Sequence, residues 1–125
     1  MNDDPVLVNI HHVQIIIPVG AEQQAREFYC GLLGLLEVPK PDELAGRGGF
    51  WLEVGALQVH IGTEEGVARI NSRAHVAYEV TGLDAWRQKL ETTGSEILDG
   101  VPIPHYRRFE FRDPFGNRVE FLERI

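Results

Sequence analysis

The sequence predicts an α+β fold made of two similar modules, each a strand, a helix and three further strands. Three observations support this fold class. The chain has 125 residues, a length that suits one domain. Its hydrophobic share of 43% is that of a globular protein. Strand-like and helix-like segments follow one another in the same order in both halves, which indicates a duplicated module. We therefore expect one domain over 1–125, with modules at about 8–63 and 74–124 and a connector at 64–73.

The first module begins with a strand at residues 9–17, which are rich in β-branched side chains. Residues 21–33 carry apolar side chains at helical spacing, and Gly34 follows as a stop signal. Three short strand-like runs complete the module: residues 35–38, 50–54 and 57–61. Gly55-Ala56 between the last two runs suits a hairpin turn.

The second module repeats this order. Residues 74–80 are strand-like, and residues 83–90 form an amphipathic helical pattern that Gly94 follows. Three strand-like runs then complete the module: residues 96–98, 106–112 and 117–122. The Asp-Pro-Phe-Gly-Asn string at 113–117 predicts a turn, because proline and glycine supply the backbone angles that turns need.

Four strands carry a candidate ligand on their polar face. His12 and His75 occupy equivalent places in the two opening strands, and His60 and Glu120 do so in the two later strands. Side chains alternate between the faces of a strand, so each of these residues lies opposite an apolar face. Histidine and carboxylate are metal-ligand types, and a sheet can bring them within reach of one ion. The alternative is a polar sheet face that simply meets water.

Composition limits the partners. The 12 Lys and Arg against 19 Asp and Glu give a net charge of −7, and an acidic surface repels nucleic acid. No apolar run approaches the roughly 20 residues of a membrane span, and the acidic start of the chain is unlike a signal peptide. Cys30 is the only cysteine, so no disulfide can form within the chain. We expect a cytoplasmic protein that binds neither nucleic acid nor membrane.

Two strings carry a family resemblance: Phe-Tyr-Cys-Gly-Leu-Leu-Gly-Leu at 28–35 and Asp-Pro-Phe-Gly-Asn-Arg-Val-Glu at 113–120. With them, the sequence from about residue 10 to 124 resembles the vicinal oxygen chelate superfamily. This superfamily contains glyoxalase I, extradiol dioxygenases, fosfomycin-resistance transferases and bleomycin-resistance proteins. The resemblance implies paired βαβββ modules that form a curved open sheet around a metal ion, and it implies a homodimer.

The resemblance also implies a ligand set. Carried over by position, the metal ligands are His12, His60, His75 and Glu120. Glyoxalase I has a carboxylate at the place of His60, whereas the dioxygenases and fosfomycin transferases use only the other three places. His60 is therefore either a fourth ligand or a residue of the pocket wall. Glu120 is also the candidate catalytic base, and the ion is expected to be Zn, Ni, Fe or Mn.

Five further side chains are candidate substrate contacts: Gln14, Trp51, Gln58, Arg108 and Arg118. A guanidinium matches an oxyanion with two parallel hydrogen bonds, although charge balance explains the arginines equally well. The alternative for Trp51 is core packing. We expect His11 at the helix side or module edge and His105 on a surface loop, both outside the site.

The expected function is a small metal-dependent enzyme that polarises an oxygen-containing substrate, with lyase or isomerase chemistry. One alternative is a metal-free protein that binds or sequesters a small molecule, as in bleomycin resistance. A third reading is an extradiol-type dioxygenase, and a fourth is an interaction partner with a vestigial site.

Overall fold

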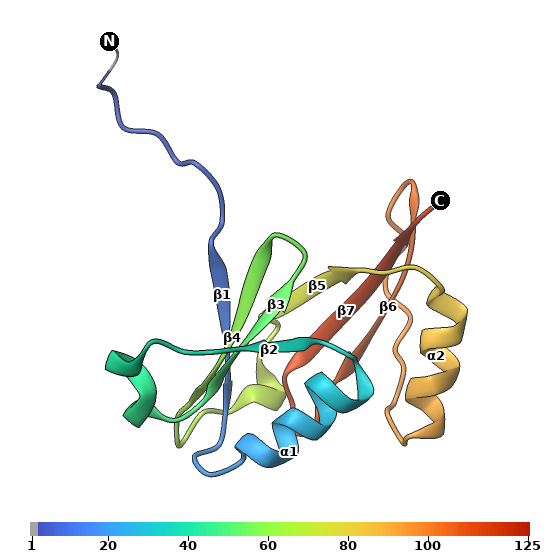
Figure 1. Ribbon diagram of the computed structural model, residues 1–125. Coiled ribbons are helices and arrows are strands. Elements are labelled where there is room, and N and C mark those ends of the chain that lie inside the picture. The colour runs from blue at the N-terminus through green and yellow to red at the C-terminus, as the bar shows by residue number, and fades with distance from the viewer. Residues whose placement is uncertain (1–2) are drawn as a thin grey trace. The chain divides into compact units, whose positions relative to one another are not determined.

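The computed structural model describes residues 3–125, which form two compact units divided between Glu65 and Gly66 (Figure 1). No helix among these residues has the length and hydrophobicity needed to cross a bilayer. Each unit contains one sheet.

Unit 1 contains a four-stranded sheet in the order β1-β4-β3-β2. Its elements are β1 (His12–Ile17), α1 (Glu22–Arg26), η1 (Glu27–Leu32), β2 (Leu36–Val38), η2 (Asp42–Arg47), β3 (Phe50–Val54) and β4 (Leu57–Thr63). Strand β1 runs parallel to β4, and the other pairs are antiparallel. The first strand begins at His12 and not at residue 9, because pairing with β4 begins only at Gln58.

The helix expected at 21–33 is divided in two. A single α-helical turn, α1, passes into a π-helical turn, η1, in which the Leu33 N–H donates to the Phe28 carbonyl five residues earlier. Ala25 and Tyr29 are fully buried, as the helical spacing predicts. Arg26 lies over the ring of Phe50 on β3, at 4.5 Å from its centroid, so this helix packs beside the sheet of its own unit.

Unit 2 contains a three-stranded sheet in the order β5-β7-β6. Its elements are η3 (Arg69–Asn71), β5 (His75–Glu79), α2 (Leu83–Thr92), β6 (Tyr106–Arg112) and β7 (Arg118–Arg124). Strand β5 is parallel to β7, and β6 is antiparallel to it. Helix α2 packs its apolar face on the sheet, where Trp86 meets Phe121 edge to face with ring centroids 5.3 Å apart.

The strand expected at 96–98 is absent, which corrects the prediction of three strands after the helix of the second module. Leu98 alone bridges to Glu110, with two backbone hydrogen bonds of 2.8 Å. Pro102 and Pro104 lack the N–H that a ladder needs, so no continuous strand follows this bridge, and the chain meets β6 again only at Ile103, which bridges to Tyr106.

The two sheets share the same register in their parallel pairs. His12 lies opposite Gln58 in unit 1, and His75 lies opposite Arg118 in unit 2. His60 follows Gln58 by two residues, and Glu120 follows Arg118 by two residues. These two candidate ligands therefore occupy the same place in their ladders. The strand registers of the two sheets therefore agree with the duplication predicted from the sequence.

Candidate functional site

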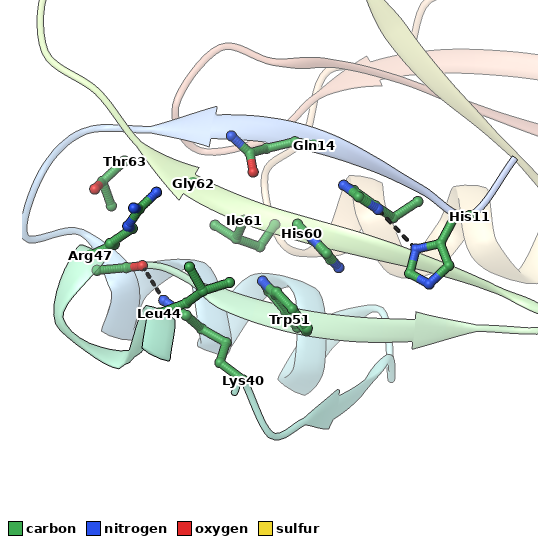
Figure 2. A pocket seen from close by; sticks show the side chains of 12 residues that line it. His11, Gln14, Lys40, Leu44, Arg47, Trp51, His60, Ile61, Gly62 and Thr63 are labelled. Carbon is green, nitrogen blue, oxygen red and sulfur yellow. Dashed lines mark hydrogen bonds between the residues drawn. The ribbon is translucent and has the colours of Figure 1, made fainter. Parts of the chain in front are cut away.

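Three rings form a stack on the sheet of unit 1 (Figure 2). The pairing registers place His60 on β4 between Gln14 of β1 and Trp51 of β3. The His60 ring stacks on Trp51 with centroids 4.0 Å apart and on His12 with centroids 3.9 Å apart. His60 Nε2 donates to Gln58 Oε1 at 2.8 Å, since an amide oxygen can only accept. The other ring nitrogen of His60 therefore keeps its lone pair.

The surroundings of His60 keep its imidazole neutral. Burial lowers the pKa of His60 to about 4, and the charges of His12, His11 and Lys40 act in the same direction. A neutral imidazole can donate its lone pair to a metal ion or accept a proton, so His60 can do either at neutral pH.

The ring stack forms one wall of a cavity of about 450 Å³. Its lining residues are His11, His12, Gln14, Lys40, Leu44, Arg47, Gly48, Trp51, His60, Ile61, Gly62 and Thr63. His11, expected at the helix side or module edge, lies directly before the edge strand β1, with its Nδ1 atom 3.0 Å from Nδ1 of His12, and its side chain lines this pocket. Because β1 begins at His12, the alternation of side chains along the strand does not determine on which side of the sheet His11 lies.

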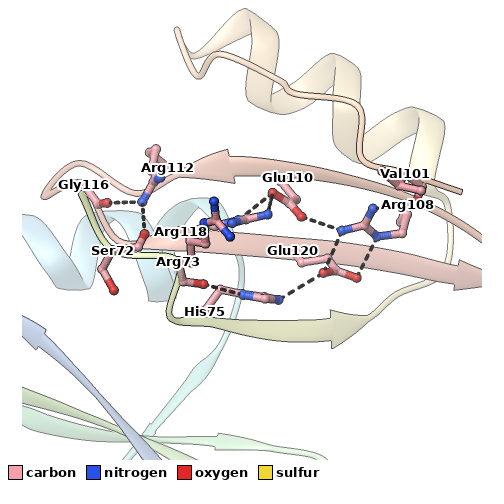
Figure 3. Close-up of polar contacts among 10 residues, drawn as sticks. All are labelled: Ser72, Arg73, His75, Val101, Arg108, Glu110, Arg112, Gly116, Arg118 and Glu120. Atoms are coloured by element: carbon pink, nitrogen blue, oxygen red, sulfur yellow. Dashed lines mark hydrogen bonds and ion pairs between the residues drawn. The ribbon is translucent and has the colours of Figure 1, made fainter. Parts of the chain in front are cut away.

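A second polar cluster lies on the sheet of unit 2 (Figure 3). His75 Nε2 lies 3.2 Å from Glu120 Oε1, and His75 Nδ1 donates to the Arg73 carbonyl at 2.9 Å. Arg108 holds both oxygens of Glu120, through Nε at 3.0 Å and Nη2 at 3.1 Å. Arg108 also binds the buried Glu110.

The ion pair with Arg108 keeps Glu120 ionised. The hydrogen bonds from Arg108 lower the pKa of the Glu120 carboxyl against the opposing effect of burial, and His75 lowers it further. The pKa of Arg108 is raised by the same contacts. The carboxylate is therefore charged at neutral pH, and it is a weaker base than an ordinary glutamate.

A family model agrees with this geometry. The model of the Glyoxalase/Bleomycin resistance protein/Dioxygenase superfamily matches residues 9–121. The chain belongs to this superfamily. Its members share the fold described above, so the resemblance seen in the sequence is confirmed.

Solved structures support the assignment to this glyoxalase superfamily. A protein of the glyoxalase family from Bacillus anthracis is 42% identical, with a TM-score of 0.88 over 98% of this chain and 99% of that chain. The fosfomycin resistance protein FosX from Listeria monocytogenes, in complex with Mn(II) and sulfate, is 14% identical, with a TM-score of 0.74 over 96% and 93%. At that identity the likeness shows the fold alone. No curated protein matches the chain.

In this superfamily member the predicted ligands lie as two pairs. His12 and His60 are together in unit 1, and His75 and Glu120 are together in unit 2. Within residues 3–125, no group of three or more His, Cys, Asp or Glu side chains is arranged to hold a metal ion.

The predicted substrate contacts do not lie in one place. Gln14 and Trp51 line the pocket of unit 1, whereas Gln58 contacts His60. Arg108 lines another cavity, of about 330 Å³ beside helix α2, and Arg118 is held by the carboxylate of Glu110. His105 is exposed on a turn before β6, as expected.

The pair in unit 2 fits a divalent ion. The hydrogen bond from His75 Nδ1 to a backbone carbonyl fixes the ring, which is the usual support of a metal-ligating histidine. The distance of 3.2 Å between its Nε2 and Glu120 Oε1 suits two ligands at about 2.1 Å from one ion. In unit 1 the rings of His12 and His60 are nearly parallel, 14° apart, so their lone pairs do not converge. One of those rings must rotate before both can bind the same ion.

Two cations of the pocket, Lys40 and Arg47, were not predicted from the sequence. Both lie in the irregular segment between β2 and β3, where no periodic pattern assigns a side chain to a face. The useful signal was the position of Arg47 directly before Gly48-Gly49, since paired glycines often let a backbone approach its neighbours closely.

Proposed function

We propose that this superfamily member is a metal-dependent enzyme that acts on a small oxygen-containing substrate, with lyase or isomerase chemistry. Its candidate ligands are His75 and Glu120, with His12 and His60 as further candidates. The candidate ions are Zn, Ni, Fe and Mn. The contact between His75 and Glu120 is the observation that carries this proposal.

Two features of the chain and one protein with the same fold support it. His75 presents Nε2 because its other nitrogen is occupied by the Arg73 carbonyl. Glu120 is ionised and held in place by Arg108, as ligating carboxylates usually are by a neighbouring hydrogen bond. FosX, which shares the fold, is described with Mn(II).

The chemistry follows from these groups. A divalent ion at this place would polarise the oxygen atoms of the substrate and stabilise developing negative charge. His60 is neutral, so it can accept a proton or hydrogen-bond the substrate. Glu120 is the candidate base, and its lowered pKa requires that its contact with Arg108 loosens before it takes a proton.

Metal analysis tests this proposal. The protein is purified without chelator, and bound metal is measured by mass spectrometry before and after incubation with Zn, Ni, Fe or Mn. We expect close to one ion per site, with at least tenfold weaker metal affinity in His75→Ala and Glu120→Gln. His105→Asn is the matched control, because His105 lies on an exposed turn, and it should bind metal like the wild type.

A metal-free small-molecule binding protein is the second candidate. Two observations favour it: Arg108 already neutralises both oxygens of Glu120, and His12 and His60 are stacked ring on ring. A protein that takes up none of the four metals, and whose His75→Ala variant binds small molecules unchanged, would support this candidate over the enzyme.

We also propose that the protein is a homodimer. Members of this superfamily pair their modules within a chain or between chains, and the run of exposed apolar side chains before β1 supports a contact with a second copy.

A further inference from the structure

The pocket of unit 1 is basic in a protein that is acidic overall. The chain has a net charge of −7, yet the pocket lining includes Lys40 and Arg47 and no aspartate or glutamate. Neither cation forms an ion pair with a carboxylate among residues 3–125. A concave surface with unpaired positive charge raises the local concentration of anions.

The segment that carries the two cations is held at both ends of η2. Lys40 Nζ donates to the Gly48 carbonyl at 2.7 Å, which links the chain two residues before η2 to the residue after Arg47. The backbone N–H of Gly49 donates to Glu22 Oε2 at 3.3 Å. These contacts fix the backbone directly after Arg47.

The glycine pair also fixes the distance of this segment from the sheet. Gly49 has a φ of +76°, and a Cβ atom at that position would lie only 2.0 Å from the Ile61 carbonyl oxygen on β4. The backbone after Arg47 is thus pressed against the strand that carries His60. The Lys40 ammonium and the backbone that follows Arg47 are therefore held before any ligand arrives, which reduces the entropy lost on binding.

Both cations keep unused hydrogen-bond donors. An ammonium has three donors, and Lys40 uses one on the Gly48 carbonyl. The guanidinium of Arg47 has five donors in a planar fork that matches a carboxylate or a phosphoryl group. Figure 2 shows both side chains in the pocket with Thr63 and Trp51. The volume of about 450 Å³ suits a small molecule.

We propose that Arg47 and Lys40 bind the anionic group of the substrate, so that the substrate is a small organic acid with a carboxylate or phosphoryl group. This inference rests on the proposed function, because it names the substrate class of the site that contains His12 and His60. The ring stack then forms the wall beside which the rest of the molecule lies.

Calorimetric titration of metal-free protein tests this inference. The protein is treated with EDTA, dialysed and titrated with succinate, with the neutral analogue succinamide and with inorganic phosphate. We expect at least one of the two anions to bind, more weakly as salt is added, and succinamide not to bind. Tighter binding of succinate indicates a carboxylate substrate, and tighter binding of phosphate indicates a phosphoryl substrate.

Charge-removing variants locate the site. Arg47→Gln and Lys40→Gln should each raise the Kd of the anion about tenfold or more, since each removes a charge-assisted hydrogen bond. Arg124→Gln removes the same charge from an exposed position in unit 2, and its Kd should stay within about twofold of the wild type. Circular dichroism checks that each variant is folded, and the salt dependence of the wild type does not depend on any variant.

The inference is overturned if succinamide binds as well as the anions, if neither anion binds, or if the folded Arg47→Gln and Lys40→Gln variants bind like the wild type. Because the titration uses metal-free protein, anion binding without metal uptake leaves this inference standing and removes the metal-dependent proposal. Metal uptake without anion binding has the opposite consequence.

Discussion

At the scale of single residues, Arg108 is the counter-ion that two buried carboxylates of unit 2 share. Glu110 and Glu120 are only 7% and 5% exposed, and Arg108 binds both of them. Burying two carboxylates is costly unless each is paired. Without Arg108, Glu110 would keep only its pair with Arg118, and Glu120 would keep only its contact with His75. This arginine, predicted as a substrate contact, has a clear structural task whatever else it contacts.

We expect Arg108→Met to lower the free energy of unfolding at pH 7 by about 3 kcal/mol. Because the folded pKa of Glu120 lies below its ordinary value of 4.5, the pairing stabilises the fold above that pH and is lost as the pH falls through the folded pKa. The penalty of the variant should therefore shrink below about pH 4.5. Urea unfolding at pH 7 and pH 4 measures it.

Arg124→Met is the control for this prediction, since its pair with Glu79 is exposed and 3.7 Å long and should contribute no more than about 1 kcal/mol. An equal loss for Arg108→Met at both pH values would show that lost packing, and not lost charge pairing, explains the effect.

His60 permits a second prediction at this scale. Its folded pKa of about 4 lies below the ordinary value of 6.5, so the unfolded chain binds more protons between these values. This group therefore stabilises the fold above pH 6.5, and that contribution is lost as the pH falls toward 4. In metal-free protein, NMR should show the His60 ring titrating near pH 4. A midpoint near 6.5 would contradict the role of burial.

At the scale of elements, the segment from η2 to β3 depends on Gly49. A methyl group there meets the Ile61 carbonyl oxygen at 2.0 Å, a backbone atom that cannot rotate away, and the positive φ adds strain. We expect Gly49→Ala to lower the free energy of unfolding by at least about 2 kcal/mol. It should also weaken anion binding, because Arg47 is displaced.

Gly46→Ala is the matched comparison for this prediction. Gly46 lies in η2, and a Cβ atom there has nothing within 4 Å. Its thermal unfolding temperature should stay close to that of the wild type or rise slightly, because alanine restricts the unfolded chain. If both variants unfold alike, the close approach of Gly49 to β4 is not what holds this segment.

The elements also show what a sequence of this kind can and cannot predict. Strands 50–54 and 106–112 were predicted at their observed bounds, because their runs are rich in apolar and aromatic side chains and lie between turn signals. The strand at 96–98 was not formed, since a pattern of three residues contains no information about the partner that must accept its hydrogen bonds. The change from α1 to η1 within one helix depends on contacts that spacing does not encode.

The candidate site also contains residues that the sequence predicts and residues that it does not. His12, His60, His75 and Glu120 could be selected because each lies on the polar face of a strand and at a repeated position. Lys40 and Arg47 could not, since their places are set by a loop whose shape follows from close contact between backbones. The rings of His12 and His60 were expected near each other, but their parallel stacking depends on rotamers that the sequence does not specify.

At the scale of the whole molecule, the exposed start of the chain predicts a second copy. Val6, Leu7, Val8 and Ile10 precede β1 and leave most of their apolar surface in water, and Leu7 is fully exposed. Such a run is unfavourable for a monomer, because burying apolar surface lowers the free energy by about 25 cal/mol per square ångström and a monomer leaves this surface in water. Contact with a partner chain would remove this cost, and β1, the edge strand of the unit 1 sheet, follows directly after this segment.

We therefore expect sedimentation velocity to give twice the chain mass of 14.1 kDa. Leu7→Asp should shift the protein toward the monomer by raising the dimer Kd at least about tenfold, since a buried charge replaces an apolar contact. Val101→Asp is the control, because Val101 is a similarly exposed apolar residue in unit 2 that should leave the dimer intact. A dimer that withstands Leu7→Asp would place the interface elsewhere, whereas a monomeric wild type would mean that one chain must supply every ligand of the proposed metal site.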